Sequence, residues 1–206
     1  MSPALQRIAF FVVPSATAFL AFGDVIAAAI LQHGRFRPED AIYVWGILAG
    51  AAVGLLASTM ARLYSAAYYA LGDTRTPLRF AVIRVVLVTA LGYLFAIVVP
   101  PRLGIDRQWG AAGLTVSAGI AGWCEFALLR TALRRRIGPS GVGATRLLKL
   151  WAAALAAAAL GWFIRIEAGA APPILRAMFV LGPYGLAFLG LAAAMRVPIP
   201  ALTRRR

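Results

Sequence analysis

Charged residues are scarce in this chain: they make up 14% of its 206 residues, whereas a soluble domain carries about a quarter. Hydrophobic residues make up 62%, and the mean hydropathy is +0.82. Several apolar runs approach the roughly twenty residues that a helix needs to cross a bilayer. This composition excludes an ordinary soluble domain and indicates a polytopic membrane protein.

Cysteine and histidine are almost absent, with one of each. Cys124 stands alone in an apolar run, so no disulfide can form within the chain. His33 cannot make a metal site by itself. The sequence also lacks a hydrolytic triad, a P-loop and a dinucleotide-binding fingerprint. We therefore expect no enzyme, no cofactor and no metal.

Acidic residues are few: seven Asp and Glu stand against 21 Lys and Arg, for a net charge of +14. A nucleic-acid-binding protein would need a solvated basic face on a folded domain. Here the arginines lie between apolar runs or at their ends. This pattern is typical of charge that sets membrane topology, and we expect no nucleic-acid partner.

Apolar runs between polar breaks predict an all-α bundle of six transmembrane helices. The predicted spans are residues 8–31, 41–71, 78–99, 110–133, 146–164 and 174–195. The first run has no small-residue cleavage site after it, so we interpret it as a retained span rather than a signal peptide.

Lys and Arg in the termini, in the connections and at the ends of the spans are unevenly divided, 13 on one side of the membrane and 6 on the other. The richer side holds Arg7, Arg75, Arg79, Arg130, Arg134, Arg135, Arg136, Arg146, Lys149, Arg196, Arg204, Arg205 and Arg206. The poorer side holds Arg35, Arg37, Arg102, Arg107, Arg165 and Arg176. The positive-inside rule then places both termini in the cytoplasm.

Four ionisable residues remain deeper within the predicted spans, away from their ends: Asp24, Arg62, Arg84 and Glu125. At 1.5 Å per residue, Arg84, Glu125 and Arg62 lie roughly 10, 12 and 15 Å from the cytoplasmic end of their spans. One interpretation is a cytoplasm-facing polar cavity whose arginines bind an anion. In the other, Arg84 pairs with Glu125 and Arg62 extends along its stem to the interface. Asp24 is expected at the outer interface, within reach of water.

Aromatic and basic side chains gather where the second and fourth spans meet the cytoplasm. Tyr64, Tyr68 and Tyr69 are expected to form an aromatic belt at this interface. The run 134–136 of three arginines is expected to fix topology and attract anionic lipids. In the second span, Gly46, Gly50 and Gly54 repeat every four residues, a spacing that permits close helix contact.

A polar corner, Gly72-Asp73-Thr74-Arg75-Thr76-Pro77, separates the second span from the third. Asp73 and Thr74 can accept hydrogen bonds from nearby backbone N–H groups. Pro77 can begin the third span, because its missing N–H would be unpaired there anyway. Thr76 is then expected to be the N-cap. We interpret the corner first as a rigid hinge between helices and second as a substrate contact.

The stretch YYALGDTRTP, residues 68–77, resembles the aromatic-Tyr-Ala-x-x-Asp-Thr-x-Thr-Pro signature of the MurJ/MviN family. The signature positions are Tyr69, Asp73, Thr74, Arg75, Thr76 and Pro77. Residues 5–16, 31–40 and 109–114 resemble three further family segments, and Arg62 falls where the family often has a lysine. The resemblance runs over roughly residues 5–136, while the last two spans match in hydropathy and position.

Members of that family are lipid II flippases with fourteen spans in two lobes, and this chain resembles the last six. The resemblance implies that residues 1–136 form four helices of the C-terminal lobe. Residues 137–206 would then supply the last two helices, which form a groove for the lipid tail, and a basic tail. Arg62, Arg84 and Glu125 are the candidates for contact with substrate.

The implied function is that of the C-terminal part of a lipid II flippase in the bacterial inner membrane, working by alternating access. Its expected partners are a lipid-linked substrate, membrane lipids and a separate N-terminal half, because one lobe alone has no complete cavity. Fragment, split subunit and remnant all remain open. The alternatives are an exporter of another polyprenyl-linked glycan and a membrane scaffold without transport activity. A homodimer is disfavoured, because its lobes would be parallel and would lack the arginines of the missing half.

Overall fold

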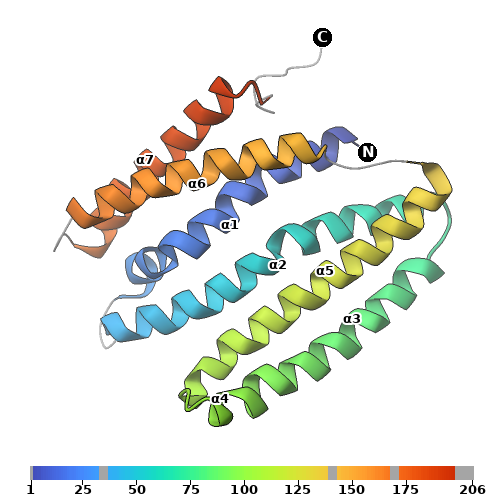
Figure 1. The fold of residues 1–206 in the computed structure, drawn as a ribbon, viewed down its shortest axis with the longest axis horizontal. Coiled ribbons are helices and arrows are strands. Elements are labelled where there is room, and N and C mark those ends of the chain that lie inside the picture. Colours follow the sequence, from blue (N-terminus) through green and yellow to red (C-terminus); the bar gives the residue numbers. More distant parts are fainter. Residues whose placement is uncertain (1, 33–36, 139–142, 168–171, 198–206) are drawn as a thin grey trace. The chain divides into compact units, whose positions relative to one another are not determined.

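The computed structural model describes residues 2–32, 37–138, 143–167 and 172–197, and every regular element in them is a helix (Figure 1). The long helices are α1 (Ser2–Leu31), α2 (Pro38–Ala70), α3 (Arg75–Tyr93), α5 (Gly110–Ile137), α6 (Ala144–Glu167) and α7 (Pro173–Ala194). Short segments η1 (Leu94–Val98), α4 (Val99–Arg102) and η2 (Arg107–Trp109) connect α3 to α5.

In the part of the chain that the structure describes, six helical stretches are long and apolar enough to cross a membrane, which agrees with the predicted number. Their bounds are Ala4–Leu31, Glu39–Ala70, Arg75–Arg102, Gly110–Arg136, Thr145–Glu167 and Pro173–Ala194. The third combines α3, η1 and α4, and it begins three residues before the predicted span. The observed bounds differ from the predicted ones mainly at charged residues near the helix ends. These residues belong to the helix although they interrupt the apolar run from which the span was predicted.

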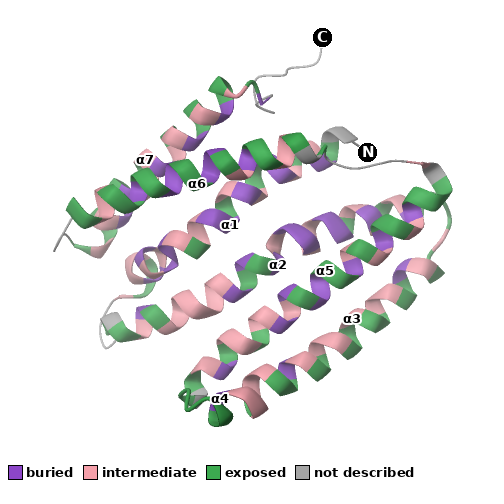
Figure 2. Ribbon diagram, in the orientation of Figure 1, coloured by how far each residue is buried: buried purple, intermediate pink, exposed green. Residues whose placement is uncertain are grey.

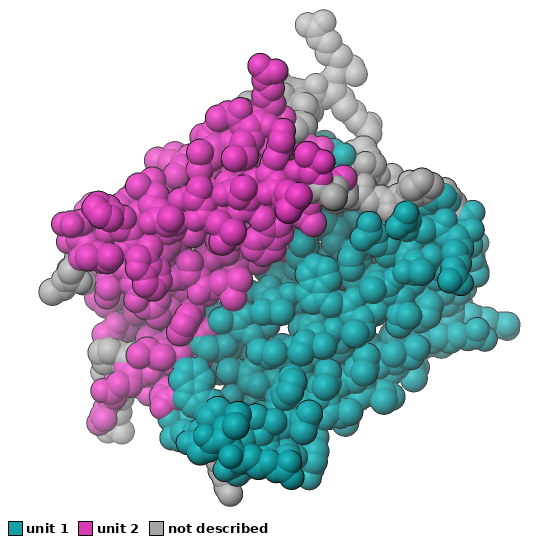
Figure 3. Space-filling view, in the orientation of Figure 1, with its two compact units in different colours: residues 1–8, 46–141 teal, residues 9–45, 142–206 magenta. Residues whose placement is uncertain are grey.

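The chain forms two compact units (Figure 3). Unit 1 comprises Met1–Ile8 and Gly46–Gly141, and unit 2 comprises Ala9–Trp45 and Val142–Arg206. Most of α1 therefore belongs with α6 and α7. The division predicted from the resemblance, 1–136 and 137–206, concerns function and remains a prediction.

In unit 1, α5 packs against both α2 and α3. A Cβ atom on Gly54 would lie only 2.5 Å from the Cα atom of Gly119, so the two backbones approach as closely as glycine allows. Beside this contact, the indole N–H of Trp123 donates a 2.8 Å hydrogen bond to the carbonyl of Val53. The close helix contact predicted from the glycine spacing is confirmed.

In unit 2, α6 and α7 pack together and α1 lies against both. Helix α1 contains Pro14 and is kinked at Phe22, whose backbone is not helical. The hydroxyl of Tyr184 donates a 2.7 Å hydrogen bond to the carbonyl of Pro14, and its ring lies edge-on to that of Phe22. Gly161 of α6 leaves room for the Phe22 ring.

The third span widens into a π-helix at η1, directly before Pro100 and Pro101. Prolines have no N–H to donate to the carbonyls of the preceding turn, which disturbs the helical hydrogen bonding there. Gly110 and Gly113 at the start of α5 lie against the carbonyls of Ala96 and Phe95. Figure 2 shows that α3 is mostly exposed or half-buried along its length, as expected of a helix facing lipid.

Candidate functional site

The candidate site begins at the polar corner between α2 and α3, where the chain reverses direction. Gly72 has a φ of +74°, which L-residues with a side chain rarely adopt. This conformation lets the N–H of Gly72 reach the carbonyl of Tyr69 and the N–H of Asp73 reach that of Tyr68, both at 3.0 Å. The glycine thus ends α2 and satisfies two of its last carbonyls.

Asp73 caps the next helix. Its carboxylate accepts the backbone N–H of Thr76 at 2.9 Å and the Thr76 hydroxyl at 2.7 Å. The prediction that Thr76 is the N-cap was wrong: α3 begins at Arg75, and Thr76 lies in its first turn. The N-cap is Thr74, whose backbone is already near-helical and whose side chain makes no cap hydrogen bond. The carboxylate of Asp73, one residue before it, accepts the Thr76 N–H instead.

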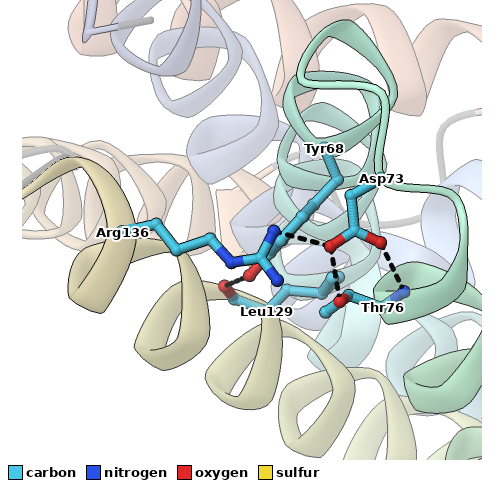
Figure 4. A network of polar contacts seen from close by, with 5 residues as sticks. All are labelled: Tyr68, Asp73, Thr76, Leu129 and Arg136. Carbon is cyan, nitrogen blue, oxygen red and sulfur yellow. Dashed lines mark hydrogen bonds and ion pairs between the residues drawn. The ribbon is translucent and has the colours of Figure 1, made fainter.

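Arg136, at the end of α5, ties this corner to a second helix (Figure 4). Its guanidinium forms a 2.6 Å ion pair with Asp73 and lies 5.6 Å from the ring centre of Tyr68. The Tyr68 hydroxyl in turn donates to the carbonyl of Leu129 at 3.4 Å. Arg136 therefore pairs with a protein carboxylate. The sequence predicted only that the arginine run 134–136 fixes topology and attracts anionic lipids, and this pairing was missed.

The hydrogen bonds from the Thr76 N–H and hydroxyl lower the pKa of Asp73 from its ordinary 3.8 to about 2, and Arg136 adds to the effect. Each of these contacts stabilises the ionised carboxylate. Asp73 is therefore negatively charged at any physiological pH.

The expected aromatic belt was wrong for two of its three members. Tyr64 and Tyr68 are 1% and 0% exposed, because they pack inside unit 1, with the Tyr64 ring edge-on to Phe126. Tyr69 is exposed. Successive helix residues differ by about 100° in direction, so Tyr68 and Tyr69 cannot share one face.

Arg84 of α3 and Glu125 of α5 form an ion pair at 3.1 Å, as one of the two interpretations expected. The Glu125 side chain is 9% exposed and that of Arg84 is 38% exposed. A carboxylate buried this deeply needs a partner, and Arg84 supplies it while keeping access to solvent. Arg62 is exposed on α2 and has no hydrogen bond or ion pair with the residues that the structure describes.

A cavity of about 460 Å³ brings the corner together with Glu125. Its polar lining consists of Ser65, Tyr69, Thr74, Arg75 and Glu125. Pro77, Leu78 and Ala81 of α3 supply the apolar wall. Sequence reasoning singled out four of these five polar residues but missed Ser65 and the shared cavity. The spacing of Ser65 and Tyr69, four residues apart on α2, was the available signal.

A third ion pair lies in unit 2, where Asp24 of α1 meets Arg165 of α6. The two side chains make two contacts, at 3.0 and 2.6 Å, and each is 22% exposed. The Arg165 guanidinium also stacks 4.7 Å from the ring centre of Trp162. Asp24 was expected to meet water at the interface, and its pairing with Arg165 was missed. Among the described residues there is no group of three or more potential metal ligands.

Six apolar helices and pairs of charges held between helices define a multi-pass α-helical membrane protein. The model of the family described as "Lipid II flippase MurJ" matches residues 1–181. The chain belongs to this family. The match reaches beyond the range of the sequence resemblance and includes the fifth span and part of the sixth.

Individual relatives agree with the family assignment. The chain is 32% identical over 180 residues to the "Probable lipid II flippase MurJ" of Rhizobium meliloti, covering 84% of this chain and 32% of that protein. It is 31% identical over 124 residues to the "Lipid II flippase MurJ" of Burkholderia cenocepacia, covering 60% of this chain and 22% of that protein. The chain thus spans about a third or less of the length of these relatives.

A solved structure shares the fold. "Lipid II flippase MurJ, inward closed conformation" matches with a TM-score of 0.73 at 19% identity, covering 94% of this chain and 38% of that one. Within the resembling segment 31–40, residues 33–36, including His33, lie outside the described residues.

Proposed function

We propose that this chain acts as the C-terminal part of a lipid II flippase in the bacterial inner membrane. The observation that carries this proposal is the family match over residues 1–181. The chain is not an enzyme in this proposal: it moves a polyprenyl-diphosphate-linked peptidoglycan precursor by alternating access.

The chain works with a second set of helices, because its relatives are about three times longer. A separately supplied N-terminal half, or the rest of a longer chain, would complete the cavity. Both termini of the six-span unit face the cytoplasm. The excess of Lys and Arg on one side supports this orientation.

Arg62 is the residue that we assign to the substrate. It lies within the span Glu39–Ala70, is exposed, and has no ion-pair partner among the described residues. An arginine kept unpaired within a membrane is costly, and such residues usually serve a pathway or a binding cavity. Arg84 is already paired with Glu125, so this pair contributes to holding α3 against α5 beside the cavity.

The test is complementation in a bacterium depleted of its own lipid II flippase. The chain is expressed alone, and together with the first eight spans of a longer relative. We expect rescue only with the added half, loss of rescue in Arg62→Ala and its retention in Arg62→Lys. Arg79→Ala is the matched control. It removes a charge near the start of α3 and should rescue.

Western blotting of membranes must show that each variant is inserted and abundant. Failure of the wild-type pair under these conditions would refute the transport role and favour a scaffold or a remnant. Rescue by Arg62→Ala would leave the transport role standing but refute the assignment of Arg62.

A further inference from the structure

The cavity at the α2–α3 corner holds four polar groups without protein partners among the described residues: Ser65, Tyr69, Thr74 and Arg75. Eight other serine and threonine hydroxyls in the helices bond to a carbonyl three or four residues earlier. Thr89 and Thr131 do so although they are exposed. Ser65 stands within α2 as these residues stand within their helices, so exposure alone does not explain its free hydroxyl.

The charged side chains around the cavity differ in whether they already have an ion-pair partner. The Glu125 carboxylate is held by Arg84, and the Asp73 carboxylate by Thr76 and Arg136. Arg75 forms no ion pair with the described residues. Counting contacts among the described residues only, the cavity lining therefore offers one free cation with three hydroxyls and no free anion.

We infer that this cavity binds the phosphate of an anionic membrane phospholipid. Arginine forms paired, charge-assisted hydrogen bonds with phosphate oxygens, and hydroxyls can donate further bonds. A zwitterionic lipid also carries an ammonium group, and both nearby carboxylates, which could attract it, are already paired. The volume of about 460 Å³ lies in the range of small-ligand pockets.

The position of the cavity suits a lipid rather than a free anion. Thr74 and Arg75 stand at the end of a membrane span, at the level where lipid headgroups lie. From this end the apolar wall of Pro77, Leu78 and Ala81 continues into the span. Exposed Val82 and Val85 follow on α3, where acyl chains can pack. This inference does not rest on the proposed flippase activity.

Native mass spectrometry of the full chain in a mild detergent tests the inference. The probes are phosphatidylglycerol, phosphatidylcholine with the same acyl chains, and inorganic phosphate. We expect one phosphatidylglycerol retained in preference to phosphatidylcholine. Arg75→Gln should weaken its retention about tenfold, as expected for loss of one charge-assisted contact. Tyr69→Phe should weaken it by a smaller factor.

The matched control is Arg79→Gln, because Arg79 lies one turn further along α3, is exposed, and does not line the cavity. Like Arg75→Gln, it removes one positive charge, but it should leave the retention of phosphatidylglycerol within about twofold of the wild type. Equal losses in Arg75→Gln and Arg79→Gln would overturn the inference in favour of general surface attraction. Three other results would also overturn the inference. These are undiminished retention of phosphatidylglycerol in Arg75→Gln, equal retention of phosphatidylcholine by the wild type, and binding of inorganic phosphate without phosphatidylglycerol.

Discussion

At the residue scale, three carboxylates within and beside the spans are each held in an ion pair that joins separate parts of the chain. Arg84–Glu125 joins α3 to α5, Asp24–Arg165 joins α1 to α6, and Arg136 of α5 meets Asp73 of the corner. Each carboxylate at these positions has a basic partner. Removing one member of a partly buried pair therefore leaves the other without compensation, which costs more than the pair itself contributes.

Glu125→Gln tests this for the Arg84 pair. We expect the variant to lower the free energy of unfolding by about 1–2 kcal/mol, less than for a fully buried pair because Arg84 reaches solvent. The double variant Arg84→Gln/Glu125→Gln should lose less than the sum of the two single variants. Unfolding in mixed detergent measures all three, and strict additivity would show that the pair is not coupled.

Asp73 predicts a pH dependence. Its pKa is about 2 in the folded chain and 3.8 ordinarily, so its ionised form contributes stability above pH 3.8. That contribution is lost as the pH falls through about 2. Asp73→Asn should therefore melt at a lower temperature than the wild type at neutral pH. The difference should shrink between about pH 4 and pH 2; a difference that stays constant over this range would refute the assignment.

At the element scale, α2 and α5 pack through glycines, which lets a tryptophan on one helix reach the backbone of the other. The Gly54–Gly119 contact has no room for a side chain, and Trp123 bonds to Val53 beside it. Within a membrane, such packing and the hydrogen bonds across it provide much of the attraction between helices.

Gly54→Ala should destabilise the chain by about 1–3 kcal/mol, because the added methyl group must push the α2 and α5 backbones apart. Gly122→Ala on α5 is the matched control, since a Cβ there meets nothing within 4 Å. It should be neutral or stabilising by up to about 1 kcal/mol, because alanine favours helix. Thermal unfolding in detergent measures the stability of both variants. Equal changes would show that helix propensity, rather than packing at Gly54, determines the effect of the added methyl group.

At the scale of the whole molecule, orientation follows from charge rather than from any single contact. The excess of Lys and Arg on one side predicts that the α2–α3 corner is cytoplasmic and that the α4–η2 connection is external. These two connections lie at opposite ends of the third span.

Cysteine labelling tests the orientation. In a Cys124→Ala background, Leu103→Cys should react with a membrane-impermeant maleimide in intact cells. Leu71→Cys should react only after lysis. Both leucines are exposed, so accessibility to solvent is not limiting. The reverse labelling pattern would show the opposite topology and contradict the cytoplasmic position of both termini.

The sequence by itself determined the six spans and the corner that ends α2, and it predicts the depth of Arg62, Arg84 and Glu125. These properties depend on the order of residues along one helix, because apolar length and turn chemistry are local. The family signature at residues 68–77 was readable for the same reason.

The tertiary structure alone decided which side chains meet. A shift of one residue turns a helix face by about 100°, so apolar runs do not fix helix rotation. This is why Tyr68 is buried while Tyr69 is exposed, and why Asp24 meets Arg165 across 141 positions of the chain. The cavity that joins Ser65, Arg75 and Glu125 depends on three helices packed together, and no local pattern along any one of them specifies it.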